Sequence, residues 1–205
     1  TGYNFYDGSN WDPEPSARIE SVRTGWPSYD TWGTNGEINV AHNGATGLQI
    51  NKRENRGTGS WTESLYANPG GVSASWPRLV TSGTNNDYIH MVFNTNAVYN
   101  GQNMALLYSR SNDGGTSWNP QNIVLTGTGS SYYKEIGPDD YTMAARGDNV
   151  AILFSNAWSD LFVMKSTDNG SNWNKIIIWN HPYPMFDFNV TITDTLFCVD
   201  ESASV

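Results

Sequence analysis

Ser111-Asn112-Asp113-Gly114-Gly115-Thr116-Ser117-Trp118 has a near copy further along the chain, Ser166-Thr167-Asp168-Asn169-Gly170-Ser171-Asn172-Trp173. Asp113 and Asp168 stand 55 residues apart (168 − 113). Each copy places Asp and Gly, which suit tight turns, between a run with strand composition and a Trp that opens another run. The repeat therefore predicts a hairpin corner at a pitch near the roughly 40–50 residues of four-stranded propeller blades.

Three units with the same order of elements follow from Arg18 onward. Trp26-Pro27 aligns with Trp76-Pro77, 50 residues later (76 − 26), and then with Gly137-Pro138. Each unit has four short strand-like runs bounded by turn residues, and no helical stretch of three or more turns interrupts them. In the second unit the fourth strand is expected from Trp118 to Leu125. The pattern predicts antiparallel sheets stacked side by side. A two-layer sandwich is the alternative, and the long repeat argues against it.

The expected fold is an all-β propeller of four-stranded antiparallel blades, with about three blades and the start of a fourth. The expected boundaries are a lead-in segment or the end of a preceding blade at 1–17, blade 1 at 18–66, blade 2 at 67–126, blade 3 at 127–180 and the start of a further blade at 181–205. Propellers usually close with roughly four to eight blades, so we expect an incomplete ring whose open faces are covered by more propeller or by a partner. The chain begins with Thr1 and has no signal-like segment, so it is interpreted as part of a longer protein.

Two runs have apolar residues at consecutive positions, Ala151–Phe154 and Ile176–Trp179. Such runs are typical of strands that are covered on both faces, and neighbouring blades would provide that cover. The lone Cys198 lies in a third apolar run and is interpreted as a small buried hydrophobic residue without a disulfide partner.

Composition excludes several classes of partner. The net charge is −9 and only 15% of residues are charged, so a nucleic-acid backbone would meet repulsion and few compensating cations. Anionic membrane surfaces are disfavoured for the same reason, and no apolar run approaches the roughly 20 residues that span a bilayer. A secreted or cell-surface protein is the expectation.

The two repeated corners resemble the Asp-box, or bacterial neuraminidase repeat, whose pattern is Ser-x-Asp-x-Gly-x-Thr-Trp. The matching residues are Ser111, Asp113, Gly115 and Trp118 in one copy, with Ser117 in the Thr position, and Ser166, Asp168, Gly170 and Trp173 in the other, with Asn172 in that position. In the first unit only Ser60-Trp61 remains of the pattern, and the resemblance covers about residues 18–179.

This resemblance implies a sialidase-like propeller in which each box is a structural corner between the third and fourth strands of a blade. The Asp accepts backbone N–H bonds and the Trp packs between sheets. Asp-box propellers include sialidases and other glycosidases but also receptors and secreted binding proteins, so the fold leaves the activity open.

The face opposite the corners is the expected place for a ligand, because the family's chemistry lies there. Its predicted loops are rich in aromatic and amide side chains, which suit sugars, although the loops of any Asn- and Tyr-rich β-protein share this composition. The candidates for ligand binding are Trp76, Arg78, Tyr99, Tyr132, Tyr133, Trp158, Asp160 and Tyr183.

Catalytic signals are sparse. A sialidase needs three convergent arginines, a Tyr nucleophile with a carboxylate partner and an acid. The Phe/Tyr-Arg-Ile-Pro opening typical of sialidases is absent, and the candidates for a sialidase or a two-carboxylate glycosidase are Arg78, Tyr133, Glu135, Asp139 and Asp140. The three histidines, His42, His90 and His181, are scattered, and the turns lack the acidic repeat of a calcium loop, so no metal or cofactor is expected.

The leading interpretation is a secreted or cell-surface module that binds a glycan or a protein through its loop face and is not an enzyme. A glycoside hydrolase of sialidase-like fold is the first alternative. A structural module, or the cargo of a bacterial secretion system such as type IX, is the second, because the Asn-rich, acidic composition resembles bacterial surface propellers.

Overall fold

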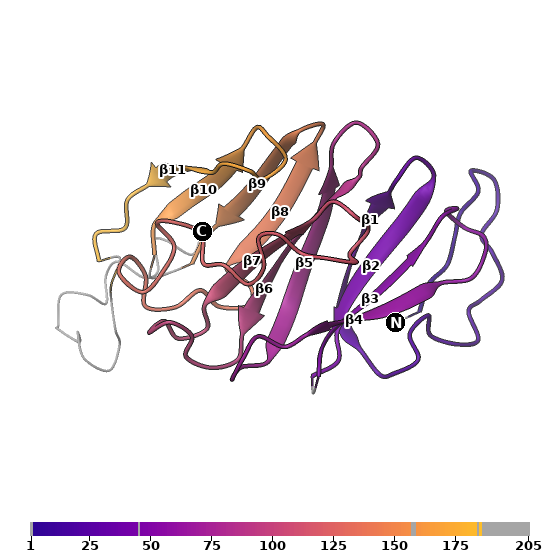
Figure 1. Ribbon diagram of the computed structural model, residues 1–205, viewed down its shortest axis with the longest axis horizontal. Coiled ribbons are helices and arrows are strands. Elements are labelled where there is room, and N and C mark those ends of the chain that lie inside the picture. Colours follow the sequence, from indigo (N-terminus) through magenta and orange to yellow (C-terminus); the bar gives the residue numbers. More distant parts are fainter. Residues whose placement is uncertain (1, 45, 157–158, 184, 186–205) are drawn as a thin grey trace.

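The computed structural model describes residues 2–44, 46–156, 159–183 and 185, and in this part the chain is all-β, with no helix (Figure 1). The strands form three antiparallel sheets. The first sheet contains β1 (Gly25–Trp32), β2 (Gly36–His42), β3 (Gly47–Arg53) and β4 (Thr62–Ala67) in the order of the chain. The second contains β5 (Ala74–Ser82), β6 (Tyr88–Thr95) and β7 (Leu106–Ser111), and the third β8 (Tyr141–Arg146), β9 (Asn149–Phe154), β10 (Leu161–Ser166) and β11 (Asn174–Trp179).

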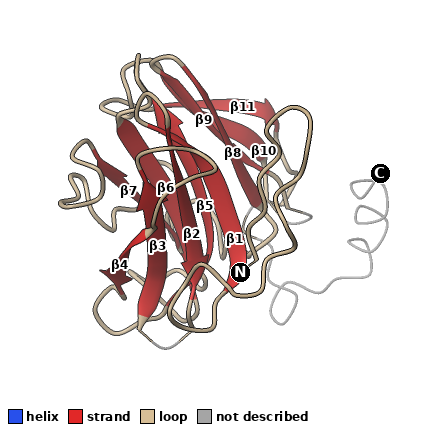
Figure 2. Cartoon of the chain, turned by 90° about the vertical axis from the view of Figure 1, so that its right-hand side faces the viewer, coloured by secondary structure: helices blue, strands red, loops and turns tan. Residues whose placement is uncertain are grey.

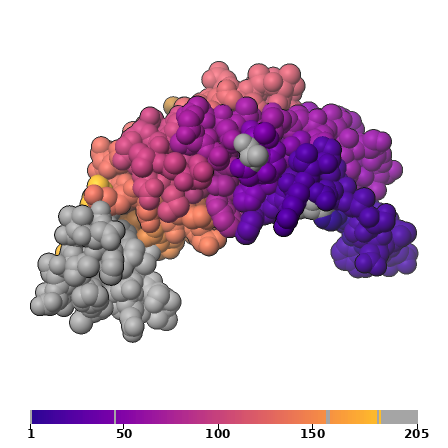
Figure 3. Space-filling view, turned by 90° about the horizontal axis from the view of Figure 1, so that it is seen from below, coloured from indigo at the N-terminus to yellow at the C-terminus, as the bar shows by residue number. Residues whose placement is uncertain are grey.

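The sheets stand face to face, with the second between the first and the third (Figures 1 and 2). In space-filling view the described residues make an arc, with the N-terminal segment at one end (Figure 3). The prediction of a partial β-propeller is thus confirmed for three blades. The predicted start of a further blade lies outside the described residues from residue 186 onward, as does Cys198.

Alternation along the strands builds the two cores between the sheets. On β6, Ile89, Met91 and Phe93 point toward the first sheet, whereas Val92 points toward the third. The core between the first and second sheets also contains Ile38, Val40, Leu48, Ile50, Tyr66, Leu79 and Leu107, and the second core contains Tyr108, Tyr141, Ile152, Phe154, Phe162 and Met164.

The strand predicted from Trp118 to Leu125 is wrong. This segment meets β7 at only one isolated bridge, between Tyr108 and Ile123, and through a further pair of backbone bonds between Arg110 and residues 119–120. Pro120 has no N–H to donate to the ladder, and Asn122 has a φ of 55°, which is incompatible with extended backbone. The second blade therefore has three regular strands and an irregular fourth edge.

The two repeated corners fold with the same hydrogen bonds. Ser111 Oγ accepts from the N–H groups of Asp113 (3.3 Å) and Gly115 (2.9 Å) and donates to Asp113 Oδ1 (2.8 Å). Asp113 Oδ1 also accepts from Ser117 N (2.9 Å). Because these hydrogen bonds favour the charged carboxylate, the bonds from Ser117 and Ser111 lower the pKa of Asp113 to about 2.

The second corner repeats these hydrogen bonds at the corresponding positions. Ser166 Oγ accepts from Asp168 N (3.3 Å) and Gly170 N (2.8 Å), and Asp168 Oδ1 accepts from Asn172 N (2.9 Å). Asn172 Nδ2 donates to Asp168 Oδ2 (2.7 Å), as the Ser117 hydroxyl does to Asp113 Oδ2 (2.5 Å). Asn therefore replaces Ser at this position without loss of a bond.

The tryptophans of the corners pack on the two cores. Trp118 lies edge-on to Tyr66, with ring centroids 5.0 Å apart, and contacts the core between the first and second sheets. Trp173 lies edge-on to Tyr108 at 5.1 Å and contacts the other core. Each corner is thereby fixed to the interior of the arc.

The segment before β1 covers the outer face of the first sheet. That face is polar, because the alternate residues of β2 and β3 that point away from the core are Glu37, Asn39, Gln49, Asn51 and Arg53, and all five are buried. Asn39 Nδ2 donates to Glu20, and Asn51 Nδ2 donates to the carbonyl of Ile19, both at 3.5 Å. The segment before β1, which contains the predicted lead-in at 1–17 and the first residues of the predicted blade 1, therefore occupies the face where a preceding blade would pack.

Within the described residues, the other end of the arc is open. β11 is the outermost strand of its sheet, and its Ile176, Ile177, Ile178 and Trp179 are 44–58% exposed. The expectation that this run is covered on both faces is wrong for the chain as described, because successive side chains point to opposite faces of the sheet and all four are exposed. None of the described segments forms a helix long and apolar enough to cross a membrane.

Candidate functional site

The first strands of two neighbouring sheets, β1 and β5, begin with the same irregularity in the backbone. Trp26 of β1 and Trp76 of β5 each precede a proline and have φ values of 48° and 52°, in the left-handed region that bulky residues rarely adopt. The strand register shifts at both places, between Gly25 and Ser28 and again between Ser75 and Arg78. A bulge of this kind re-aims a side chain, and such bulges are common beside functional sites.

The bulges bring the two indoles into contact. The Trp26 and Trp76 rings lie 4.0 Å apart between centroids at 62°, and the His42 ring lies 4.9 Å from Trp26 and 5.5 Å from Trp76. Trp26 remains 54% exposed. We call Trp26, His42 and Trp76, together with Arg78 and Tyr141, the inner ledge.

Hydrogen bonds between β1 and β5 fix the distance between the strand that carries Trp26 and the strand that carries Trp76. Leu79 N donates to Ser28 Oγ at 2.9 Å, and Thr81 N donates to Asp30 Oδ2 at 2.8 Å. The Thr81 hydroxyl also donates to the carbonyl of Thr31 at 2.8 Å. The indoles are therefore held by backbone that is tied across the two sheets.

His42, the last residue of β2, is bonded to β5 through a neutral imidazole ring. Its Nδ1 accepts the backbone N–H of Trp76 at 3.1 Å, so in the neutral form the proton is on Nε2. Burial lowers the pKa of His42 below its ordinary value, because the interior disfavours the charged form. At neutral pH the ring thus packs as an uncharged group against both indoles.

Arg78 and Tyr141 continue the inner ledge toward the third sheet. The Tyr141 hydroxyl donates to the carbonyl of Trp76 (2.5 Å), and the Arg78 guanidinium lies 5.7 Å from the centre of the Tyr141 ring. Burial raises the pKa of Tyr141, so this phenol keeps its proton and its bond to Trp76. The inner ledge thus contains a partly exposed indole, Trp26, and a partly exposed cation, Arg78, which is two residues from Trp76 on β5.

A second group of predicted residues lies on the β6–β7 loop and on the segment between β7 and β8. Tyr99 and Tyr132 line a cavity of about 270 Å³ with Asn100, Gln102 and residues 124–127 and 129–131. Its wall is fixed by Gln102, whose Nε2 donates to the carbonyls of Thr128 (2.9 Å) and Tyr133 (3.1 Å). This cavity shares no residue with the inner ledge. Of the predicted ligand-binding residues, the structure places Trp76 and Arg78 in the inner ledge and Tyr99 and Tyr132 at this cavity.

Tyr133 is buried beneath that cavity. Its hydroxyl donates to Asp160 Oδ2 (2.8 Å) and accepts from Lys175 Nζ (2.6 Å), and burial raises its pKa. Glu135, another catalytic candidate, accepts from Asn103 Nδ2 at 2.8 Å. With 1% of its surface exposed, the Tyr133 phenol is part of the packing between loops and not a nucleophile in contact with solvent.

The remaining candidates also have defined surroundings. Asp140 Oδ2 accepts from the N–H of Gly137 (2.5 Å) and from Asn156 Nδ2 (2.6 Å), which closes a turn, whereas Asp139 is exposed. Tyr183 is 40% exposed and its N–H donates to His181 Nδ1 at 2.9 Å. Trp158 lies outside the described residues.

Metal ligands do not gather anywhere in the described ranges, where no group of three or more His, Cys, Asp or Glu could hold an ion. His90, for example, is packed inside the second sheet between Ser82 Oγ (2.7 Å from Nε2) and the Tyr108 hydroxyl (2.8 Å from Nδ1). Both ring nitrogens are therefore used by neighbours.

Sequence reasoning missed four residues of these sites: Trp26, His42, Tyr141 and Lys175. Trp26 had a usable signal, because Trp26-Pro27 aligns with the Trp76-Pro77 pair that supplied a candidate. The other three had none, since each depends on a contact between different sheets or loops.

Comparison with known proteins gives structural likeness only. No family model matches the sequence, and no curated protein matches it. The catalytic domain of the GH62 alpha-L-arabinofuranosidase of Coprinopsis cinerea is similar in structure, with 14% identity and a TM-score of 0.46 over 82% of this chain and 54% of that chain. The NanB sialidase of Streptococcus pneumoniae is similar over 68% of this chain and 19% of that chain, with 18% identity and a TM-score of 0.36. The chain thus spans about half the length of the first protein and about a fifth of the second.

Proposed function

We propose that this protein is a secreted or cell-surface propeller module that binds a glycan through the inner ledge, and that it prefers sugars with a carboxylate. The observation that carries the proposal is the Trp-Pro bulge built twice, at Trp26 and Trp76, which brings two indoles together on adjacent inner strands. A left-handed backbone at a Trp costs free energy, and its recurrence at matching places favours a functional reason.

The chemistry of the inner ledge supports this ligand class. An indole offers a flat apolar face to a sugar ring, and 54% of the Trp26 surface is exposed for that purpose. Arg78 carries a planar guanidinium, which matches a carboxylate in shape and charge. On a protein of net charge −9, a local cation is also needed if an acidic sugar is to approach.

We further infer that the two corners are Asp-box repeats. The matched bonds around Asp113 and Asp168 support this inference, because both carboxylates are used by their own turns. The two corners follow the ends of β7 and β10, and this leaves the opposite face of the arc, where β1 and β5 begin, for the ligand.

Binding is favoured over hydrolysis because two of the nominated acids, Asp140 and Glu135, and the phenol of Tyr133 already have partners. Asp140 closes a turn, Glu135 binds Asn103, and Tyr133 is buried against Asp160. A two-carboxylate glycosidase needs two carboxyl groups free to flank one bond. The glycoside hydrolase alternative is kept as an outcome of the test below.

The experiment measures binding of sialyllactose and of an oligogalacturonate by calorimetry, with lactose as the neutral counterpart. Trp26→Ala is expected to lower affinity for the acidic probes about tenfold, since it removes one stacking face. Arg78→Gln is expected to lower affinity for the acidic probes and to remove the preference over lactose. Trp179→Ala, which removes an indole that is 44% exposed on β11, is the matched control and should bind like the wild type.

Two results would overturn this proposal. One is an absence of binding to every acidic probe by the wild-type protein, and the other is unchanged affinity in Trp26→Ala. Chromatography of the same mixtures tests the alternative, because release of monosaccharide by the wild type would assign the protein to the hydrolases.

A further inference from the structure

A second cavity lies between the N-terminal segment and the outer face of the first sheet. Its volume is about 670 Å³, within the roughly 300–1,000 Å³ of small-molecule sites. It shares no lining residue with the inner ledge, and its walls are unusually aromatic: Tyr3, Phe5, Tyr6, Trp11 and Tyr29 line it.

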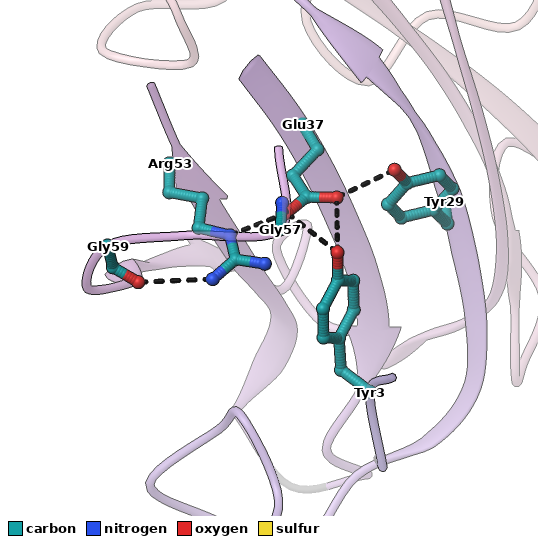
Figure 4. A network of polar contacts seen from close by, with 6 residues as sticks. All are labelled: Tyr3, Tyr29, Glu37, Arg53, Gly57 and Gly59. Atoms are coloured by element: carbon teal, nitrogen blue, oxygen red, sulfur yellow. Dashed lines mark hydrogen bonds and ion pairs between the residues drawn. The ribbon is translucent and has the colours of Figure 1, made fainter. Parts of the chain in front are cut away.

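The floor of this cavity is fixed by a buried carboxylate, Glu37 (Figure 4). Tyr3 and Tyr29 donate their hydroxyls to Glu37 Oε2 at 3.0 and 2.7 Å, so both phenol rings are held from their polar ends. The N–H of Gly57 donates to Glu37 Oε1 at 3.1 Å, and Arg53 Nε donates to the same oxygen at 2.5 Å. The two phenol rings are therefore preorganised as flat surfaces.

The charges beneath the floor neutralise each other. Burial would raise the pKa of Glu37, but the bonds from Tyr29, Gly57 and Arg53 outweigh burial and lower it. The Arg53 guanidinium lies 4.8 Å from the centre of the Tyr3 ring and 4.5 Å from that of Trp61, and its Nη1 donates to the carbonyl of Gly59. The charges of Glu37 and Arg53 therefore compensate each other inside the wall, and the pair has no net charge to attract an ionic ligand.

The outer wall is a small loop that presents an indole. Tyr6 and Trp11 form an isolated bridge, and their rings lie 5.2 Å apart at 41°. Between them, Asp7 Oδ1 accepts the N–H groups of Ser9 and Asn10, both at 2.7 Å, which closes the turn. Trp11 is 66% exposed and Tyr6 is 47% exposed, although large aromatic side chains normally bury most of their surface.

We propose that this cavity binds neutral pyranose units of a polysaccharide. Aromatic rings on two walls suit a sugar ring, which is apolar on its faces and polar at its edge. The lining residues Asn4 and Arg56 are exposed and carry polar groups for that edge. The lining contains one carboxylate, Asp7, and one guanidinium, Arg56, so the ligand that fits it is neutral overall.

The experiment titrates the protein with cellohexaose, xylohexaose and mannohexaose by calorimetry. The wild type is expected to bind at least one of these, and Trp11→Ala is expected to lower that affinity about tenfold or more. Trp11→Phe keeps an aromatic face and should retain part of the affinity, which separates stacking from a loss of local structure. Tyr6→Ala provides a second variant on the same wall.

Trp26→Ala distinguishes this site from the inner ledge, because it should leave binding of the neutral hexaoses unchanged while it lowers binding of acidic probes. The proposal is overturned if the wild type binds none of the three hexaoses, or if Trp11→Ala and Tyr6→Ala both bind them as the wild type does. Loss of hexaose binding in Trp26→Ala alone would assign the neutral sugar to the inner ledge and would also overturn it.

Discussion

Replacing Glu37 by Gln is expected to destabilise the protein strongly. The carboxylate is fully buried, accepts hydrogen bonds from Tyr3, Tyr29, Arg53 and Gly57, and forms an ion pair with Arg53, which is 8% exposed. Gln has nearly the same shape but leaves the guanidinium buried without a counter-charge. Loss of one partner of a buried pair costs about 3–5 kcal/mol.

Thermal unfolding followed by circular dichroism measures this cost. For a domain of this size about 1 kcal/mol shifts the Tm by roughly 2–4 °C, so Glu37→Gln should lower the Tm by about 6–20 °C. Glu54→Gln is the matched control, because Glu54 is exposed and neighbours Arg53. A surface change of this kind is expected to stay within about 0.5 kcal/mol.

The pH dependence gives a second readout of the same pair. The pKa of Glu37 is lowered from its ordinary value of 4.5, so its contribution is present above that value and is lost as the pH falls through the folded-state pKa. The Tm gap between the wild type and Glu37→Gln should therefore narrow below about pH 4.5. Equal Tm values for Glu37→Gln and Glu54→Gln at pH 7 would refute the reasoning.

Two further predictions concern the corners and the second sheet. Ser111→Ala should lower the free energy of unfolding, measured in urea, by about 1–3 kcal/mol, because it leaves the N–H groups of Asp113 and Gly115 without their acceptor. Ser166→Ala should cost a similar amount. A neutral result for both variants would contradict the hydrogen-bond account. Burial lowers the pKa of His90 from 6.5 to about 3, so the wild type should lose stability as the pH falls from about 6.5 toward 3. The stability of His90→Gln should depend less on pH over that range. Parallel curves of stability against pH for the two proteins would contradict this prediction.

Sequence reasoning predicted the blades because their signals are local. Asp, Gly and Trp at fixed spacing specify a corner, and alternation on strands such as β6 specifies which residues enter a core. The failure at Trp118–Leu125 was also local: Pro120 and Asn122 disrupt a run whose composition otherwise suits a strand. Weighing the missing N–H of the proline would have corrected it.

The sites were harder to predict because they depend on contacts between distant residues. Tyr133 and Glu135 were both candidates and are close in the sequence, whereas the carboxylate that the Tyr133 hydroxyl contacts belongs to Asp160, 27 residues away. Tyr3 reaches Glu37 across 34 residues, from a segment with no periodicity to reveal its course. Arg78 and Trp76 were among the predicted residues, and the aligned Trp-Pro pairs could have added Trp26, but the contact between the two indoles is evident only in the structure.

The inner ledge can be tested most directly by NMR of the ¹⁵N-labelled protein, in which each indole N–H gives its own signal. On addition of sialyllactose or oligogalacturonate, the Trp26 and Trp76 signals should shift in proportion to occupancy, while those of the corner residues Trp118 and Trp173 should stay in place. Shifts confined to Trp118 and Trp173, or no shift of any indole at saturating probe, would contradict the assignment of ligand binding to the inner ledge.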